Sequence, residues 1–188
     1  MSVELSPIIA GVMNWGVWDK NLNTNEFTHL INLFIENGIT TFDHADIYGG
    51  YTTEASFGKA LSESKIDRKK IQLITKCGIQ YVSENRPNNS IKHYEYSKDY
   101  IIWSAENSLK NLQTDYLDVF LLHRPSPLMQ ADEIAEAVSK LKADGKILSF
   151  GVSNFTSSQT ELLRQKTEIS FNQVQFSATH HEAMLDGS

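Results

Sequence analysis

Short, almost continuous apolar segments recur along the chain. They occupy residues 8–13, 40–42, 71–75, 117–122, 147–152 and 171–176. Segments of this length that are apolar on both faces are typical of strands buried in a parallel sheet. The pattern therefore predicts six buried strands.

Amphipathic segments with helical spacing lie between these strands. The clearest one begins with Asn23 and Glu26 in a capping-box arrangement and ends at Gly38. Two further stripes cover residues 97–112 and 134–145. A strand followed by a helix recurs about every 30 residues, the size of one βα unit. This order predicts a parallel sheet with right-handed crossovers.

Two α/β architectures fit that order, an open doubly wound sheet and a closed (β/α)8 TIM barrel. A nucleotide-binding doubly wound sheet should carry closely spaced glycines after its first strand, but no two of the 10 glycines have the spacing G-x-G. A barrel should place polar functional residues at the C-terminal ends of many strands. Such residues lie toward the ends of all six apolar segments: Asn14 with Trp15, Asp43, Lys76, His123, Ser153 with Asn154, and Gln173. The distribution favours the barrel.

The length of the chain limits how much of a barrel it contains. A complete barrel typically takes ~250 residues and eight strands, whereas this chain has 188 residues and six readable strands. We therefore expect residues 1–188 to form one barrel domain with about six of the eight βα units, lacking the C-terminal strands and loops. Its first and sixth strands would be open edges through which the chain could self-associate.

The composition and charge of the chain indicate which binding partners to expect. The formal net charge is −6 and 40% of the residues are hydrophobic. An acidic globular chain of this kind is not expected to bind nucleic acid or an anionic membrane surface, which require a basic face. The lone Cys77 and the absence of a leader or a long apolar segment indicate a cytoplasmic protein.

Four of the polar residues combine into one chemical site. In a barrel, Asp43, Tyr48, Lys76 and His123 would converge on one mouth, because they lie at the ends of neighbouring strands. A free tyrosine has a pKa of about 10 and is a poor proton donor at neutral pH. An adjacent ammonium favours the phenolate and lowers that pKa, and a carboxylate offsets the cost of burying the ammonium. Such a site exchanges a proton with the oxygen of a carbonyl/alcohol pair.

Five motifs in order give the sequence a resemblance to a known family. They are G-I-x-T-F-D-x-A-x-x-Y-G at 38–49, T-K at 75–76, L-D-x-x-x-x-H-x-P at 117–125, G-V-S-N-F at 151–155 and F-N-Q-V at 171–174. Over essentially its whole length, the chain resembles the aldo-keto reductase family.

The resemblance implies an activity and a role for each matching residue. It implies an oxidoreductase that reversibly transfers hydride between NADPH, or alternatively NADH, and an aldehyde or ketone, without a metal. Tyr48 would be the proton donor, Lys76 and Asp43 would tune it, and His123 would bind and position the substrate carbonyl.

The cofactor would be held mainly at the ends of the later strands. By resemblance, Ser153, Asn154 and Gln173 hydrogen-bond the nicotinamide carboxamide. Asn14, in the first strand-end loop, and Asp43 would also lie close to the cofactor. We expect Trp15 to line the substrate mouth.

One connection is unusually long. Residues 78–96 are polar, aromatic and aperiodic, which is typical of a functional lid. At the C-terminal rim of a barrel, we expect this segment to be a loop that faces the substrate.

Two other functions compete with carbonyl reduction. In the first, Lys76 is a Schiff-base nucleophile of an aldolase-type barrel, although a carboxylate partner would hold the amine charged. In the second, the chain is a non-catalytic regulatory or scaffold protein that binds the cofactor and acts through partners. Cofactor titration combined with a size measurement would distinguish this function from an enzyme.

Overall fold

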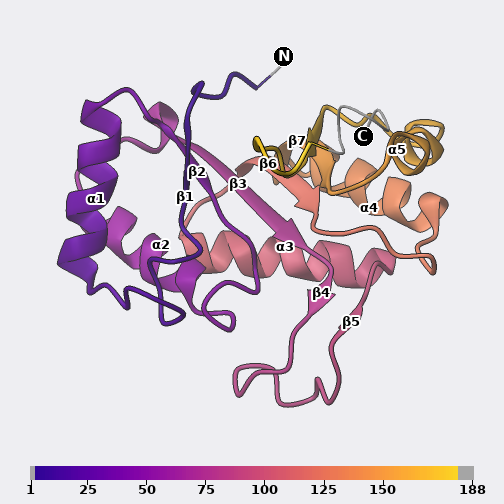
Figure 1. Cartoon of the computed structure of the whole chain (residues 1–188), viewed down its shortest axis with the longest axis horizontal. Coiled ribbons are helices and arrows are strands. Elements are labelled where there is room, and N and C mark those ends of the chain that lie inside the picture. Colours follow the sequence, from indigo (N-terminus) through magenta and orange to yellow (C-terminus); the bar gives the residue numbers. More distant parts are fainter. Residues whose placement is uncertain (1–2, 182–188) are drawn as a thin grey trace.

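Six parallel strands form one curled sheet in the computed structural model of the chain, which describes residues 3–181 (Figure 1). The strands run in the order β1 (Ile9–Gly11), β2 (Thr41–Asp43), β3 (Gln72–Cys77), β6 (Leu117–Leu122), β7 (Ile147–Ser153) and β8 (Phe171–Gln173). Every neighbouring pair is parallel. The six predicted strands are thus confirmed, and together they form part of a barrel.

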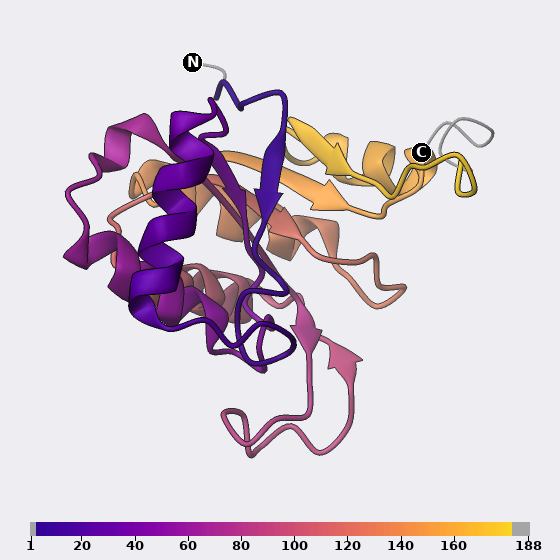
Figure 2. The same ribbon diagram turned by 60° about the vertical axis from the view of Figure 1, so that its left-hand side comes forward.

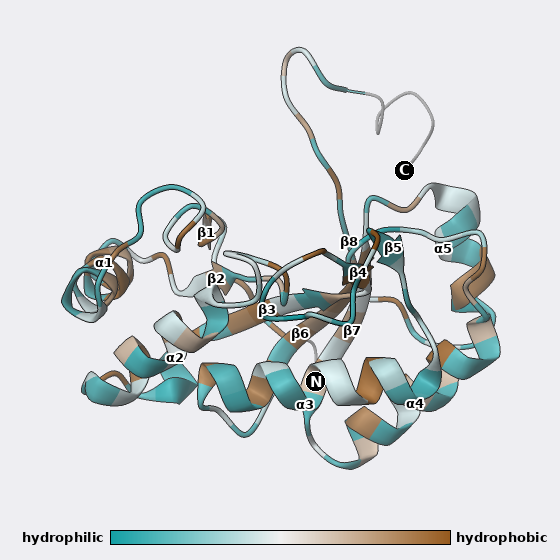
Figure 3. Ribbon diagram, turned by 90° about the horizontal axis from the view of Figure 1, so that it is seen from below, coloured by the Kyte–Doolittle hydropathy of each residue, from teal (hydrophilic) through white to brown (hydrophobic). Residues whose placement is uncertain are grey.

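Helices cover the outer face of this sheet (Figure 3). They are α1 (Thr24–Glu36), α2 (Thr53–Glu63), α3 (Lys98–Leu112), α4 (Ala131–Ala143) and α5 (Ser157–Arg164), with a short 3-10 turn η1 (Arg68–Lys70). The capping box at Asn23 and Glu26 is formed as predicted. Helix α2 was not among the predicted elements. None of the helices in the described part of the chain is long and apolar enough to cross a membrane.

The two faces of the sheet are packed very differently. Alternate strand residues such as Phe42, Phe120 and Phe150 are completely buried in the large core between the sheet and the helices. The residues between them point to the inner, concave face, where the buried apolar cluster is small: Ile74, Val119 and Leu121, with Val3, Leu5 and Phe171 packed against it. This leaves room for polar side chains on the concave side.

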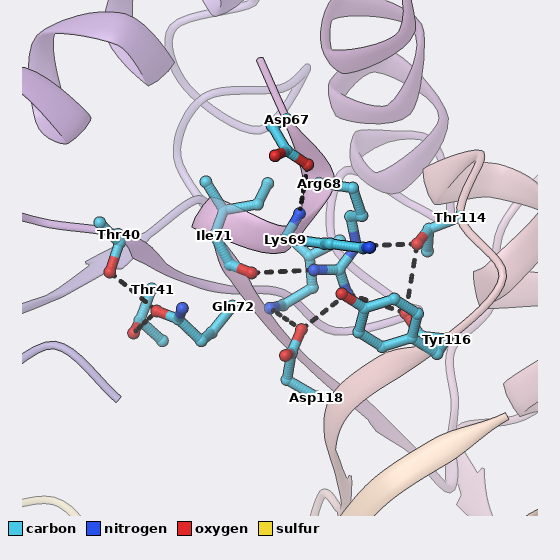
Figure 4. A network of polar contacts seen from close by, with 11 residues as sticks. Thr40, Thr41, Asp67, Arg68, Lys69, Ile71, Gln72, Thr114, Tyr116 and Asp118 are labelled. Carbon is cyan, nitrogen blue, oxygen red and sulfur yellow. Dashed lines mark hydrogen bonds and ion pairs between the residues drawn. The ribbon is translucent and has the colours of Figure 1, made fainter. Parts of the chain in front are cut away.

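A network of polar contacts fixes the N-terminal ends of the central strands (Figure 4). The guanidinium of Arg68 donates a hydrogen bond to Asp118 at 2.6 Å and others to Thr114 and to the carbonyl of Tyr116. The same Asp118 carboxylate accepts a bond from the backbone N–H of Leu73. These contacts tie β3 to β6 at the end where barrel residues serve stability rather than catalysis.

The segment 78–96 contains a hairpin that the sequence did not predict. β4 (Ile79–Gln80) and β5 (His93–Tyr94) pair antiparallel and project beyond the C-terminal ends of the sheet strands (Figure 2). Gly78 adopts φ +111°, and a side chain there would collide with the ring of Tyr96. Two short strands therefore anchor the expected loop, and residues 81–92 connect them.

Candidate active site

Strand register brings the predicted polar side chains to one face. Asp43 pairs with Ile74, and Lys76 is two residues further along β3, so it shares the concave face with Ile74. Lys76 pairs in turn with Leu121, and His123 follows two residues later. Their side chains therefore converge at the C-terminal end of the sheet.

The ammonium of Lys76 lies at the centre of this group. Its side chain is only 2% exposed, and its Nζ lies 2.8 Å from both carboxylate oxygens of Asp43. Nζ also donates to the backbone carbonyl of His44 at 2.8 Å and to the hydroxyl of Tyr48 at 3.2 Å. The charge is thus paired and hydrogen-bonded, which offsets the cost of burying it.

Tyr48 lies in a tight turn that follows β2. Gly49 and Gly50 both have a positive φ, near +60°, a conformation that glycine adopts without strain. Burial raises the pKa of the Tyr48 hydroxyl above its ordinary value, and the neighbouring Lys76 opposes this increase. The sequence led us to expect a net decrease, but here the loss of solvent outweighs the effect of the ammonium. The phenol consequently keeps its proton at neutral pH.

His123 faces the same space as Tyr48. The two ring centroids are 6.1 Å apart in an edge-to-face arrangement. Burial, together with the positive charges of Lys76, Arg124 and Lys92, lowers the pKa of His123 to about 3. The imidazole is therefore neutral near pH 7 and can orient a carbonyl oxygen through its N–H, but it cannot serve as a cationic acid.

The ends of β7 and β8 contribute hydroxyl and amide groups. Ser153 donates a hydrogen bond to the backbone carbonyl of Gln173 at 3.1 Å and accepts one from the side chain of Asn154 at 2.8 Å. Asn154 has φ +59°, a left-handed conformation in which asparagine is enriched. Within residues 3–181, the side-chain amide of Gln173 has no hydrogen-bond partner. This amide is therefore available to a ligand.

These groups line one cavity of about 770 Å³ at the C-terminal end of the sheet. The predicted residues that line it are Asp43, Tyr48, Lys76, His123, Ser153, Asn154 and Gln173. Asn14 lines a different hollow, together with Gly11 and Leu30.

Contrary to our expectation, Trp15 does not line this mouth. It is 7% exposed and stacks on Phe34, with the ring centroids 5.7 Å apart, in the core beneath α1. Trp18 lies at the cavity instead, and its ring packs edge-to-face on Tyr48 at 6.2 Å and on Tyr81 at 5.8 Å.

Further residues that the sequence analysis missed come from the hairpin and its neighbours. Ile79, Lys92 and Tyr94 line the cavity from the segment 78–96, and Arg124 does so from the loop after β6. The polar, aromatic composition of 78–96 was the only signal for the three residues of that segment.

A second buried acid lies behind the cavity. Asp46 is 4% exposed, and one carboxylate oxygen accepts hydrogen bonds from Tyr100 at 3.2 Å and Ser104 at 3.3 Å. Burial, assisted by the nearby Glu54, raises the pKa of Asp46 to about 8. Since the backbone N–H of Asp46 donates to the carbonyl of Lys76, this acid is built into the support of the site.

Comparison with known proteins identifies the family to which the chain is similar. Residues 7–185 match the Aldo/keto reductase family. The chain is 46% identical over 188 residues to an oxidoreductase of Bacillus subtilis and 44% identical over 187 residues to an oxidoreductase of Escherichia coli. These alignments cover 99% and 98% of this chain but 62% and 61% of the relatives, so the chain spans about three fifths of their length.

Solved structures show the same likeness in three dimensions. The glycerol dehydrogenase of Gluconobacter oxydans superposes with a TM-score of 0.86 at 27% identity, covering 99% of this chain and 56% of that one. The holo form of an aldo-keto reductase from Bacillus halodurans superposes with a TM-score of 0.78 at 28% identity, covering 92% and 54%. The six-stranded sheet thus corresponds to part of a (β/α)8 barrel.

Proposed function

Because the chain belongs to the aldo/keto reductase family, we propose that its cavity reduces an aldehyde or ketone to an alcohol with a reduced nicotinamide cofactor, NADPH in the first instance. One observation carries the proposal. The hydroxyl of Tyr48 is held against a buried, paired ammonium, at 3.2 Å from Lys76 Nζ, and beside a neutral imidazole. This arrangement suits proton delivery to a carbonyl oxygen.

Tyr48 is the proton donor in this proposal. Lys76 donates a hydrogen bond to the Tyr48 oxygen, so the hydroxyl proton of Tyr48 remains free to be given to a substrate. As that proton leaves, negative charge develops on the phenol oxygen, and the fixed ammonium stabilises it. Asp43 holds the ammonium in place through both carboxylate oxygens.

His123 orients the carbonyl. Its neutral ring donates one N–H, and the low pKa keeps the ring from acting as a competing acid. The carbonyl oxygen would then lie between an imidazole donor and a phenol donor.

The donor set at the ends of β7 and β8 fits a nicotinamide carboxamide. A carboxamide both donates and accepts, and the free amide of Gln173 with the polar atoms of Ser153 and Asn154 offers both. When bound there, the nicotinamide supplies the hydride for the carbonyl carbon. Asp43, which lines the same cavity, would lie beside it.

The aldolase alternative is disfavoured by the contacts of Lys76. Its N–H groups are directed at Asp43, the His44 carbonyl and Tyr48, whereas a Schiff base requires a neutral, accessible amine. A regulatory role predicts cofactor binding without turnover, so binding and turnover are measured separately.

Substitution of Tyr48 tests the mechanism. We expect the chain to consume NADPH in the presence of butanal, followed by the loss of reduced-nicotinamide absorbance. Tyr48→Phe should lower kcat by about 100-fold or more, because it removes the general acid, and should leave cofactor affinity almost unchanged. Tyr116→Phe is a matched control, since that ring packs on Arg68 at the opposite end of the sheet.

Two outcomes would contradict the mechanism. Full turnover by Tyr48→Phe would exclude the phenol as the acid. Tight NADPH binding by the unmodified chain without consumption of any aldehyde, in a large assembly, would favour the regulatory role instead.

A further inference from the structure

Two positively charged side chains stand at the mouth of the cavity. Lys92 precedes β5 and Arg124 follows His123, and both line the cavity together with Tyr48. Both residues are exposed. Among residues 3–181, neither side chain has an ion pair or a hydrogen bond. Their charges are therefore available to a ligand.

The charge of the cavity is opposite to that of the chain. The whole chain carries a net charge of −6, yet the described lining contains three cations, Lys76, Lys92 and Arg124, and a single carboxylate. That carboxylate, Asp43, is already bound through both oxygens to Lys76. Many lysines elsewhere on the described surface are paired with acids, including Lys98 and Lys146. Unpaired cations also occur elsewhere in the described part of the chain, Lys59 and Lys65 among them, so what distinguishes Lys92 and Arg124 is that both line the cavity beside Tyr48.

A specific contact sets the backbone of Arg124 against the hairpin. The Tyr96 hydroxyl donates a hydrogen bond to the carbonyl of Arg124 and accepts one from its N–H at 3.2 Å. Tyr96 lies two residues after β5, the strand that Lys92 precedes. The loop that carries one cation is therefore fixed to the element that carries the other. Both charges also reach the reacting end of the cavity, because both lower the pKa of His123.

From these observations, and resting on the function proposed above, we infer that the preferred substrates are carbonyl compounds that also carry a carboxylate or phosphate group, which Lys92 and Arg124 bind. A guanidinium recognises both anions through two parallel hydrogen bonds, and an ammonium adds a mobile second charge. Trp18 and Tyr94 supply apolar walls for the carbon chain between the anion and the carbonyl.

A matched pair of aldehydes tests this inference. Succinate semialdehyde and butanal have the same chain length but differ in charge. We expect kcat/KM to be higher for succinate semialdehyde, and we expect the ratio of the two values to fall about tenfold in Arg124→Met and in Lys92→Met. Lys59→Met removes one positive charge from an exposed position on α2, away from the cavity, and should leave the ratio unchanged. Added salt should lower the ratio in the unmodified chain.

Direct binding separates this inference from the proposed function. Succinate semialdehyde is titrated without cofactor while tryptophan fluorescence is followed, and Trp18→Phe identifies the contribution of the tryptophan at the mouth. If neither aldehyde is reduced, the proposed function fails, but weaker binding by Arg124→Met than by Lys59→Met still supports the anion site. Equal binding by the two variants, or an unchanged ratio of kcat/KM, overturns it. An increase confined to the Kd of NADPH in Arg124→Met also overturns it, because the cations would then serve the phosphates of the cofactor.

Discussion

Lys76 illustrates how a single strand position can hold a charge inside the protein. The alternation of side chains along β3 directs Lys76 to the concave face, where the apolar cluster is small. Asp43 on β2 lies on the same face. The ion pair at 2.8 Å then keeps the ammonium in place. Because the pair is nearly inaccessible, its strength depends little on salt. In the proposed reaction, this fixed ammonium stabilises the Tyr48 oxygen once its proton has left.

Asp46 gives a prediction about pH. Its pKa is about 8 in the folded chain against an ordinary 3.8, so the folded state holds a proton that the unfolded state releases between these values. This group therefore costs stability as the pH rises from about 4 to 8. Asp46→Asn should remove that cost. The free energy of unfolding of the variant minus that of the unmodified chain should therefore increase with pH, by up to about 1.4 kcal/mol per pH unit within that range.

Urea unfolding at pH 5, 6 and 7 measures this difference. The unmodified chain is measured at each pH because His44 and His123, with pKa values lowered to about 3, raise the stability of both proteins as the pH rises. Their contribution cancels in the difference between the two proteins. A difference between the two proteins that does not change with pH would show that Asp46 is ionised in the folded chain.

Single residues also show where sequence reasoning reached its limit. Asp43, Lys76, His123 and Gln173 could be placed at the cavity because each lies at or just after the C-terminal end of a strand, and these ends meet at one edge of the sheet. Trp15 and Trp18 lie in an irregular turn with no such period. Gly16, between them, lies so close to Thr53 that a Cβ atom would collide with the Thr53 hydroxyl. In this turn Trp15 enters the core and Trp18 reaches the cavity. The turn packs against α2, and the local sequence does not reveal that contact.

At the scale of elements, the contact between α2 and α3 depends on a glycine. Gly58 lies in the middle of α2, and a Cβ atom there would collide with the backbone carbonyl of Asn111 near the end of α3. Alanine is ordinarily about 1 kcal/mol better than glycine in a helix. Here we expect Gly58→Ala to destabilise the chain by about 2 kcal/mol or more, because backbone atoms must move apart.

Urea unfolding of Gly58→Ala and of Lys59→Ala provides the measurement. Lys59 is the next residue and is exposed, so its substitution should change stability by no more than about 0.5 kcal/mol. An unchanged or increased stability in Gly58→Ala would mean that the two helices do not approach this closely.

The elements that the sequence failed to predict have short or interrupted patterns. Each strand of the hairpin, Ile79–Gln80 and His93–Tyr94, has two residues, which is too short to show an alternation of apolar and polar positions. Helix α2 contains Gly58, which weakens a helical pattern. The six sheet strands were predictable because burial on both faces leaves continuous apolar segments.

At the scale of the whole molecule, the sheet has two ends. β1 and β8 are its outermost strands and each pairs on one side in the described part of the chain. The expectations that residues 1–188 form a single domain and that the chain self-associates through these edges stay predictions. What the described residues do establish is a concave face with a polar cavity at its C-terminal end, the end at which (β/α)8 barrels in general hold their active sites.

The proposed transfer of hydrogen from a reduced nicotinamide to a carbonyl carbon in this cavity can be followed with an isotopic label. Deuterium-labelled NADPH, carrying the label at the transferred position, is incubated with butanal and the chain, and the butanol formed is analysed by mass spectrometry. We predict butanol with one deuterium on its alcohol carbon, and almost none of it with Tyr48→Phe. Unlabelled butanol would show that hydrogen does not pass from the cofactor to the carbonyl carbon, and the same yield from both proteins would show that Tyr48 is not the acid.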